Sequence, residues 1–387
     1  MRPVETFLRG QGIHLLLDAE SKLCKATNGK LTPRCTPGRI QYSTVHTDST
    51  VIPQKRTESE VFLAKFDADG NYCTDDFVLL VTTDLHFEDD PVLRDKTYQM
   101  LANQIMDVKP DLVLFTGDII LSNHQQIDGV RFARMMEELG VYWAFVFGNH
   151  EARAEKEYHK YFLLKNMAQY PHCLTQFGPP ELFGYGNFMI HILENENKIR
   201  QTLVCLDSGR DIIDSYREKD NIPDDVNGYD YLKENQKQWY KWHLAALRRQ
   251  YGDFKSMMFM HIPLKEYEHV FRKDENGDFV PTGEAEILYG GQYESVGCSR
   301  INSGMFDLIR ELGSTQAVFA GHDHVNDFCA EYQGVKLVYA QCGGYETYTM
   351  QDIGNWEESR WMQGATVVRI KPDGSIDLAQ RFNSMYL

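Results

Sequence analysis

The stretch FVLLVTTD at residues 77–84 decides the fold. Its apolar, β-branched run has the length of a buried strand, and it ends in an aspartate. The same design returns in DLVLFTGD at 111–118 and in YWAFVFGN at 142–149, which end in an aspartate and an asparagine. Residues 91–106 and 125–139, between these runs, have helical spacing. This strand–helix alternation is typical of a layered α/β fold.

The rest of the chain continues the pattern. Further strands are expected at 188–193, 202–209, 256–263 and 317–324, helices at 233–249 and 303–312, and antiparallel pairs within 328–344 and 365–382. Two sheets packed face to face, with helices outside, fit this inventory. Residues 1–72 carry none of the chemistry described below. We expect them to form a small β appendage or an irregular N-terminal extension, with a strand at 60–67.

Composition narrows the function. The chain has 387 residues, of which 42% are hydrophobic, and a net charge of −16. Such an acidic surface repels nucleic acids and anionic membranes. It also repels phosphate substrates, so any attraction for phosphate must arise locally, from bound metal ions. The sequence contains no run of eighteen apolar residues, so no membrane-spanning helix is expected.

The termini and cysteines favour the cytoplasm. The N-terminal stretch lacks the apolar core and cleavage site of a convincing signal peptide. None of the eight cysteines forms a C-x-x-C pair, so a zinc knuckle or thioredoxin motif is unsupported. We therefore expect reduced, mostly buried cysteines in a cytoplasmic protein.

Metal-competent side chains follow the predicted strands. They occur in five motifs: Asp84-Leu85-His86, Gly117-Asp118, Gly148-Asn149-His150-Glu151, His261, and Gly321-His322-Asp323-His324. Open α/β sheets place ligands at the carboxyl ends of their strands. Residues i and i+2 of an extended chain point to one face, so each D-x-H or H-x-H pair can reach one ion. With Asp118 bridging, the set could hold two ions.

Each motif alone has an ordinary explanation. Asp84 could cap a turn beside a surface His86, Asp118 could be a helix N-cap, and Asn149 a turn residue. A lone His261 after an apolar strand is more often a satisfied core side chain than a ligand. The joint occurrence of all five motifs, in order and each after a strand, favours a metal centre. Asp323 or Asp327 would then be available to fix an imidazole tautomer.

The pattern D-x-H, G-D, G-N-H-E/D, H, G-H-x-H resembles the calcineurin-like metallophosphoesterases. Similarity around 206–209, 229–233, 261–264 and 321–328 points to a branch that contains fungal phosphatases and small plant purple-acid-phosphatase-like proteins. The resemblance implies a four-layer αββα sandwich of two mixed β-sheets over residues 73–387. Residues 1–72 lie outside it.

The resemblance also implies roles for individual residues. One ion would be bound by Asp84, His86, Asp118 and His324, and the other by Asp118, Asn149, His261 and His322. His150 would act as general acid or stabilise the transition state. True purple acid phosphatases carry a tyrosine at the position of Leu121, so a purple Fe(III) site is not expected here. The ions would be Mn, Fe or Zn.

These features predict an enzyme that hydrolyses phosphate esters by a metal-activated hydroxide, with phosphomonoesters as the favoured substrate class. A phosphodiesterase of the same fold is the alternative, and a non-catalytic metal-binding scaffold is a more distant one. A serine hydrolase is disfavoured because no G-x-S-x-G motif is present. Loops at the strand ends would contact the substrate, with four candidates: Asn123, His124, Tyr229 and Tyr345.

Overall fold

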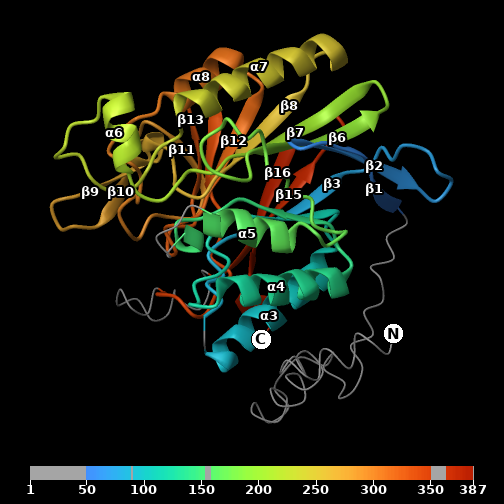
Figure 1. Ribbon diagram of the computed structural model, residues 1–387, viewed down its shortest axis with the longest axis horizontal. Coiled ribbons are helices and arrows are strands. Elements are labelled where there is room, and N and C mark those ends of the chain that lie inside the picture. The colour runs from blue at the N-terminus through green and yellow to red at the C-terminus, as the bar shows by residue number, and fades with distance from the viewer. Residues whose placement is uncertain (1–48, 89, 153–157, 350–362, 387) are drawn as a thin grey trace.

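The computed structural model describes residues 49–88, 90–152, 158–349 and 363–386, which form two stacked β-sheets with helices on both outer faces (Figure 1). The smaller sheet has the strand order β16-β15-β3-β4-β5. Its strands are β3 (Phe77–Thr82), β4 (Leu112–Phe115), β5 (Trp143–Phe145), β15 (Gly364–Ile370) and β16 (Ile376–Phe382). Strands β3, β4 and β5 run parallel, so their carboxyl ends meet at one edge.

The larger sheet has nine strands in the order β1-β2-β6-β7-β8-β12-β14-β13-β11. Their bounds are β1 (Ser49–Arg56), β2 (Glu60–Asp67), β6 (Phe188–Asn195), β7 (Lys198–Cys205), β8 (Lys255–Phe259), β11 (Glu286–Tyr289), β12 (Thr315–Ala320), β13 (Cys329–Tyr332) and β14 (Val335–Tyr339). Strands β7, β8, β12 and β14 are mutually parallel, so this sheet also has an edge of carboxyl ends. Strands β9 (Phe271–Lys273) and β10 (Phe279–Pro281) form a separate pair.

Helices cover the outer faces of the two sheets (Figure 1). Helices α3 (Pro91–Val108), α4 (Gln125–Leu139) and α5 (Tyr158–Met167) pack on the smaller sheet, and α7 (Glu234–Tyr251) and α8 (Met305–Leu312) on the larger one. Helix α6 (Asp214–Asp220) and the 3₁₀ turns His150–Ala152, Lys265–His269 and Asn383–Tyr386 complete the described elements. The αββα sandwich expected from the sequence is confirmed.

Three apolar layers hold the sandwich together. The central layer lies between the sheets, where Leu79 and Leu114 of the smaller sheet face the same cluster as Ile190 and Phe259 of the larger one. This explains why the inner strands are apolar throughout: each buries both faces. The outer layers lie under the helices.

The strands are shorter than the sequence predicted. Strand β3 ends at Thr82 and β4 at Phe115, two and three residues before the aspartates that were expected to end them. Likewise, β5 ends at Phe145, before Asn149. The intervening residues form loops, so the aspartates and the asparagine lie beyond the strands.

The expected strand at 60–67 is present as β2, and β1, which was not predicted, precedes it. Strand β2 pairs in parallel with β6, so the larger sheet contains strands from both sides of the predicted boundary at residue 72. The division of the chain at residues 72 and 73 stays a prediction, and residues 1–48 lie outside the described residues.

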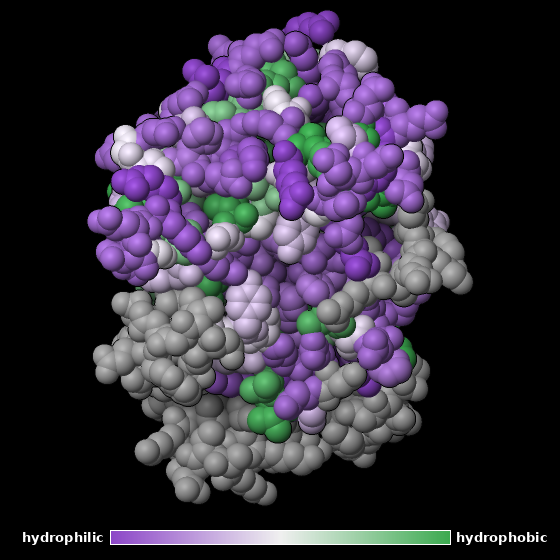
Figure 2. All heavy atoms as spheres, turned by 90° about the vertical axis from the view of Figure 1, so that its left-hand side faces the viewer, coloured by the Kyte–Doolittle hydropathy of each residue, from purple (hydrophilic) through white to green (hydrophobic). Residues whose placement is uncertain are grey.

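The surface of the described residues is as hydrophilic as the charged composition predicts. The face in Figure 2 is mostly hydrophilic, with apolar residues in small separate groups. No helix in the described ranges has both the length and the apolar character needed to cross a membrane. The six described cysteines are free, and five of them are buried.

Phe132 of α4 tests the outer layer. Its buried ring lies 5.1 Å from that of Phe115 and 5.4 Å from that of Trp143, measured between centroids. Phe132→Ala should lower the free energy of unfolding by about 3–5 kcal/mol, because it leaves a cavity in a packed core. Urea unfolding measures this loss. Ile127→Ala on the same helix is the control, since Ile127 is 53% exposed. Equal losses in both variants would contradict the packing described here.

Candidate metal centre

The predicted ligands come together at the carboxyl ends of strands from both sheets. Asp84 and His86 follow β3, Asp118 follows β4 and Asn149 follows β5. His261 follows β8. The last two predicted ligands, His322 and His324, follow β12. Because the two sheets are stacked with these ends together, residues nearly 240 positions apart become neighbours: the amide of His322 donates to Oδ2 of Asp84 at 2.9 Å.

The backbone at these positions is unusual. Asp84, His86, Asp118 and His322 all have positive φ, of 51°, 48°, 48° and 76°. Side chains other than glycine rarely adopt this left-handed conformation, which costs about 1–3 kcal/mol per residue and gathers at functional sites. The extended geometry expected for Asp84 and His86 is therefore wrong. A turn, rather than a continuing strand, brings these two side chains together.

Asp118 is the centre of the cluster. Its Oδ2 lies 3.2 Å from Nε2 of His261, 3.6 Å from Nε2 of His86 and 3.7 Å from Nε2 of His150. Three imidazole nitrogens thus face one buried carboxylate oxygen at distances mostly too long for good hydrogen bonds. This arrangement is typical of a carboxylate whose natural partner is a cation.

Asp84 has similar surroundings. Its Oδ1 lies 3.4 Å from Nε2 of both His86 and His324. The ligand atoms fall into compact groups, of which one holds Asp84, His86 and His324 and another holds Asp118, His261 and His322. Asn149 adjoins the second group, with Oδ1 2.9 Å from Nε2 of His261. A third group joins His150 to His86 and Asp118.

Opposite charges offset the cost of burying these groups. Burial opposes ionisation of Asp84, but the charges of His324 and His261 outweigh it and hold its pKa well below the usual range. Burial likewise disfavours the imidazolium of His261, yet the Asp118 and Asp84 carboxylates raise its pKa to about 10. A metal ligand must be deprotonated, so an ion bound at His261 would compete with a proton for Nε2.

Neighbouring groups fix two of the rings. Nδ1–H of His261 donates to the carbonyl oxygen of Thr116 at 2.8 Å, which turns Nε2 toward the carboxylates. Nδ1 of His324 lies 2.5 Å from Oγ1 of Thr347, and the ring of Tyr348 stacks on that of His324 at 4.1 Å. The contribution of residues 347–348 was missed, because nothing in that segment's pattern sets it apart.

Among the described residues, the hydrogen bonds of Asp323 go to groups other than imidazoles, contrary to expectation. Asp323 accepts hydrogen bonds from the amide of Gly297 and from the hydroxyl of Tyr339. Asp327 accepts from the amide of Gly291 at 2.9 Å. Both carboxylates hold neighbouring loops in place through these hydrogen bonds. The position of Asp323 and Asp327 in the sequence motif does not indicate this role.

Glu151 also binds backbone. Its carboxylate accepts from the amides of Gly148 at 2.7 Å and of Asp118 and Ile120 at 3.2 and 3.1 Å. It therefore joins the loop after β4 to the loop after β5. Between these loops, the amide of His150 donates to Oδ1 of Asp118 at 2.8 Å, which leaves Oδ2 directed to the imidazoles.

Two motif glycines are required by close packing. A Cβ on Gly148 would lie 2.0 Å from Oδ1 of Asp118, and one on Gly117 would lie 2.6 Å from Nδ1 of His261. Gly117 also has a φ of 99°, which disfavours any side chain. The glycines before the ligands thus let the loops approach one another.

The four candidate substrate contacts differ in position. The ring of Tyr229 meets that of His322 edge-on at 4.3 Å, so it borders the cluster. Asn123 and His124 are exposed at the start of α4. Tyr345 packs against α3, where Nζ of Lys96 lies 3.7 Å from the centre of its ring. Their roles stay predictions.

Comparison with known proteins agrees with this geometry. The family model described as calcineurin-like phosphoesterase matches residues 77–326. Among curated relatives, "Probable inactive purple acid phosphatase 14" of Arabidopsis thaliana is 30% identical over 65% of this chain and 63% of its own length. "Phosphatase DCR2" of Saccharomyces cerevisiae is 31% identical over 61% of this chain and 39% of its own.

The alignments thus span less than two thirds of the relatives' lengths. A solved structure, a dimetal phosphatase from Danio rerio, superposes with a TM-score of 0.50 and 16% identity. It covers 80% of this chain and 97% of its own length, and supports the fold.

Asp118→Asn should remove both metal ions from the reconstituted protein, since Asp118 Oδ2 faces ligands of both groups. Elemental analysis should show a fall from roughly two metal equivalents per chain to well below one. Asp323→Asn is the matched control, because that buried carboxylate lies between His322 and His324 yet binds Gly297 and Tyr339. One full equivalent retained in Asp118→Asn would refute the bridging position.

Gly148→Ala should weaken metal binding at least tenfold, because the new methyl group must displace the Asp118 carboxylate. Isothermal titration calorimetry with Mn²⁺ measures the affinity. Gly140→Ala is the control: a Cβ there meets open space, although its φ of 65° makes the change mildly destabilising. Unchanged affinity in Gly148→Ala would show that the close approach to Asp118 is unimportant.

Proposed function

This chain belongs to the calcineurin-like phosphoesterase family, and on that premise we propose that it hydrolyses phosphate esters, phosphomonoesters first, with two divalent metal ions. The observation that carries the proposal is the convergence of imidazoles from both ligand groups on Asp118 Oδ2. A single side chain that faces two groups of ligands fits a bridge between two ions.

The residues present fit such a pair of ions. Oδ2 of Asp118 is buried and accepts no well-aligned hydrogen bond from the described residues, as expected for an oxygen reserved for a cation. We assign Asp84, His86, Asp118 and His324 to one ion, and Asp118, Asn149, His261 and His322 to the other. The mixed imidazole and oxygen donors suit Mn, Fe or Zn.

Two such ions, when bound, would lower the pKa of a bound water to near neutrality. They would also offset negative charge on the attacking and leaving oxygens of a phosphoryl group. The chain's own residues supply position and protons. Thr116 and Thr347 hold the rings of His261 and His324, and Glu151 holds the two loops that carry Asp118 and His150. A prearranged site of this kind needs little reorganisation during reaction.

His150 is the proposed proton donor to the leaving group. It is only partly buried, and its Nε2 lies 3.7 Å from Asp118 Oδ2, so it borders the ligands and faces solvent as well. A general acid must reach the leaving oxygen within hydrogen-bonding distance. Its proximity to His86 and Asp118 also makes it a possible ligand by geometry, and the variant below separates the two roles.

A metal-binding scaffold without catalysis is the second candidate. The names of some Arabidopsis relatives, such as "Probable inactive purple acid phosphatase 29", favour it. Against it, this chain retains every ligand of the motif set together with His150, and their ligand atoms lie close together. Retention of the complete set supports catalysis.

The proposed activity is tested with the metal-free protein reconstituted separately with Mn²⁺, Fe²⁺ and Zn²⁺. Each sample is assayed on phosphomonoesters and phosphodiesters, with metal content measured on the same sample. We expect hydrolysis that depends on about two metal equivalents and that is faster for monoesters. Faster cleavage of diesters would change the substrate class. A fully loaded protein with no activity on either class would favour the scaffold.

His150→Ala should retain both ions and lose about 10²–10⁴-fold in kcat/KM on alkyl phosphates, whose alkoxide leaving group needs a proton. The loss on nitrophenyl phosphate should be much smaller, because nitrophenolate leaves unaided. Similar losses on both esters, with metals retained, would refute the proton-donor role. Loss of metal would instead make His150 a ligand.

A further inference from the structure

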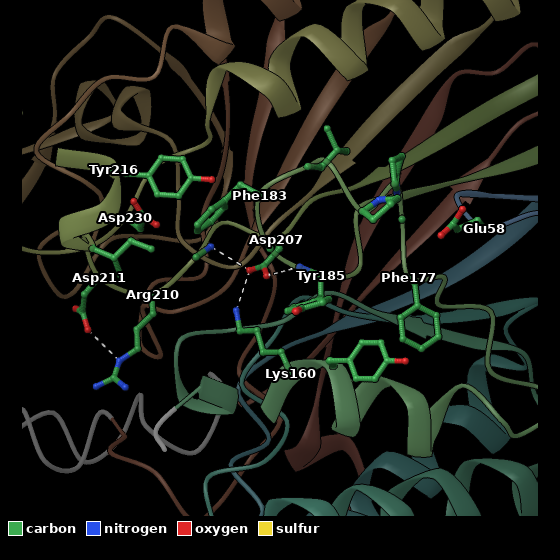
Figure 3. Close-up of a pocket in the computed structure, with 18 residues that line it drawn as sticks. Glu58, Lys160, Phe177, Phe183, Tyr185, Asp207, Arg210, Asp211, Tyr216 and Asp230 are labelled. Carbon is green, nitrogen blue, oxygen red and sulfur yellow. Dashed lines mark hydrogen bonds and ion pairs between the residues drawn. The ribbon is translucent and has the colours of Figure 1, made fainter. Parts of the chain in front are cut away.

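A cavity of about 880 Å³ lies at the carboxyl end of β7, next to the strand that carries His261. Figure 3 shows Arg210, Asp211, Tyr216 and Asp230 at one end and Glu58 and Phe177 at the other. Its volume is typical of a small-molecule site. Nothing in the proposed chemistry uses it.

Two contacts connect one end of the cavity to the metal ligands. Ser208, between the lining residues Asp207 and Gly209, accepts a hydrogen bond from the amide of Ile262 at 2.9 Å, and Ile262 follows His261. The lining residue Asp211 forms a β-bridge with Tyr229, whose ring meets that of His322 at 4.3 Å. One end of the cavity's lining is therefore attached, through Ser208 and Tyr229, to the residues that adjoin His261 and His322.

Five aromatic rings line the cavity. They come from α5, α6 and the loop before β6: Tyr161, Phe177, Phe183, Tyr185 and Tyr216. The ring centroid of Tyr161 lies 5.4 Å from that of Phe177 and 6.0 Å from that of Tyr185, and that of Phe183 lies 5.1 Å from that of Tyr216. Such walls bind flat apolar groups through edge and face contacts.

The charges in the lining are largely paired within the protein. Nζ of Lys160 lies 2.9 Å from Oδ1 of Asp207, and Nε of Arg210 lies 2.9 Å from Oδ2 of Asp211. Asp230 is paired with Lys233 at 2.6 Å. A second phosphate would have to break one of these pairs, whereas an uncharged ring would not. The cavity therefore suits an uncharged group.

We propose that this cavity receives the leaving group of the substrate, and that this group bears an uncharged aromatic ring. The phosphate would lie at the metal centre, and the ring would enter the cavity past Tyr229 toward Phe183 and Tyr216. The inference rests on the proposed function, since it adds a substrate class to the same site.

The test compares 2-phenylethyl phosphate with ethyl phosphate on the metal-loaded protein. Both release an alkoxide of similar basicity, so a difference in kcat/KM reports on the ring. We expect 2-phenylethyl phosphate to be favoured by about 10–100-fold, mainly through KM, because the ring leaves water for an aromatic wall. Tyr216→Ala should reduce this preference to a few-fold while leaving ethyl phosphate unaffected.

Phe162→Ala is the matched control. The ring of Phe162 contacts that of Tyr161 at 5.4 Å and is 47% exposed, but it lies outside the cavity lining. It should keep the preference. Equal kcat/KM for the two esters in the unaltered protein would overturn the inference and leave the proposed hydrolase intact.

If neither ester were hydrolysed, the proposed function would fail, and binding would decide the inference. The probes are then 2-phenylethylphosphonate and ethylphosphonate, which cannot be hydrolysed, measured by calorimetry on the metal-loaded chain. Tighter binding of the aromatic phosphonate, lost in Tyr216→Ala, supports the cavity as a ring site. Equal affinities contradict it.

Discussion

Two carboxylates, those of Asp84 and Asp118, are buried side by side, and the surrounding structure depends on offsetting their charge. Burial disfavours the ionised form of both carboxyl groups, and the Asp84 carboxylate further opposes ionisation of Asp118. The imidazoles of His261 and His324 supply compensating positive charge. Two divalent cations would supply it more completely, which is why the same groups that are costly in the folded chain fit a metal centre.

The two sheets make this cluster possible. Neither sheet alone carries the full set of candidate ligands: the smaller one contributes Asp84, His86, Asp118 and Asn149, and the larger one contributes His261, His322 and His324. The apolar layer between the sheets therefore does more than stabilise the fold, since it brings the two halves of the site together. The left-handed turns beyond the strands then direct the side chains inward at the cost of backbone strain.

Most of the fold and the ligand set could be predicted from the sequence because both leave strong local patterns. The buried strands are continuous apolar runs, and α4 has the bounds that its periodicity indicates. The motifs supplied the candidate ligands, whose side chains the structure brings together. What failed was conformation: the turn at Asp84 and His86 depends on contacts with Gly117, Asp118 and residues near 322, which are distant in sequence. Asp323 and Thr347 were misjudged or missed for the same reason, and the cavity beside Ser208 has no sequence signature, because its rings come from separate segments.

A crystal structure of the manganese-reconstituted protein, with anomalous scattering used to place the ions, tests the central claim most directly. The account predicts two anomalous peaks roughly 3.5–4 Å apart, with the Asp118 carboxylate between them and His86 and His261 on opposite ions. A single peak, or two peaks that share no ligand, would contradict a centre bridged by Asp118.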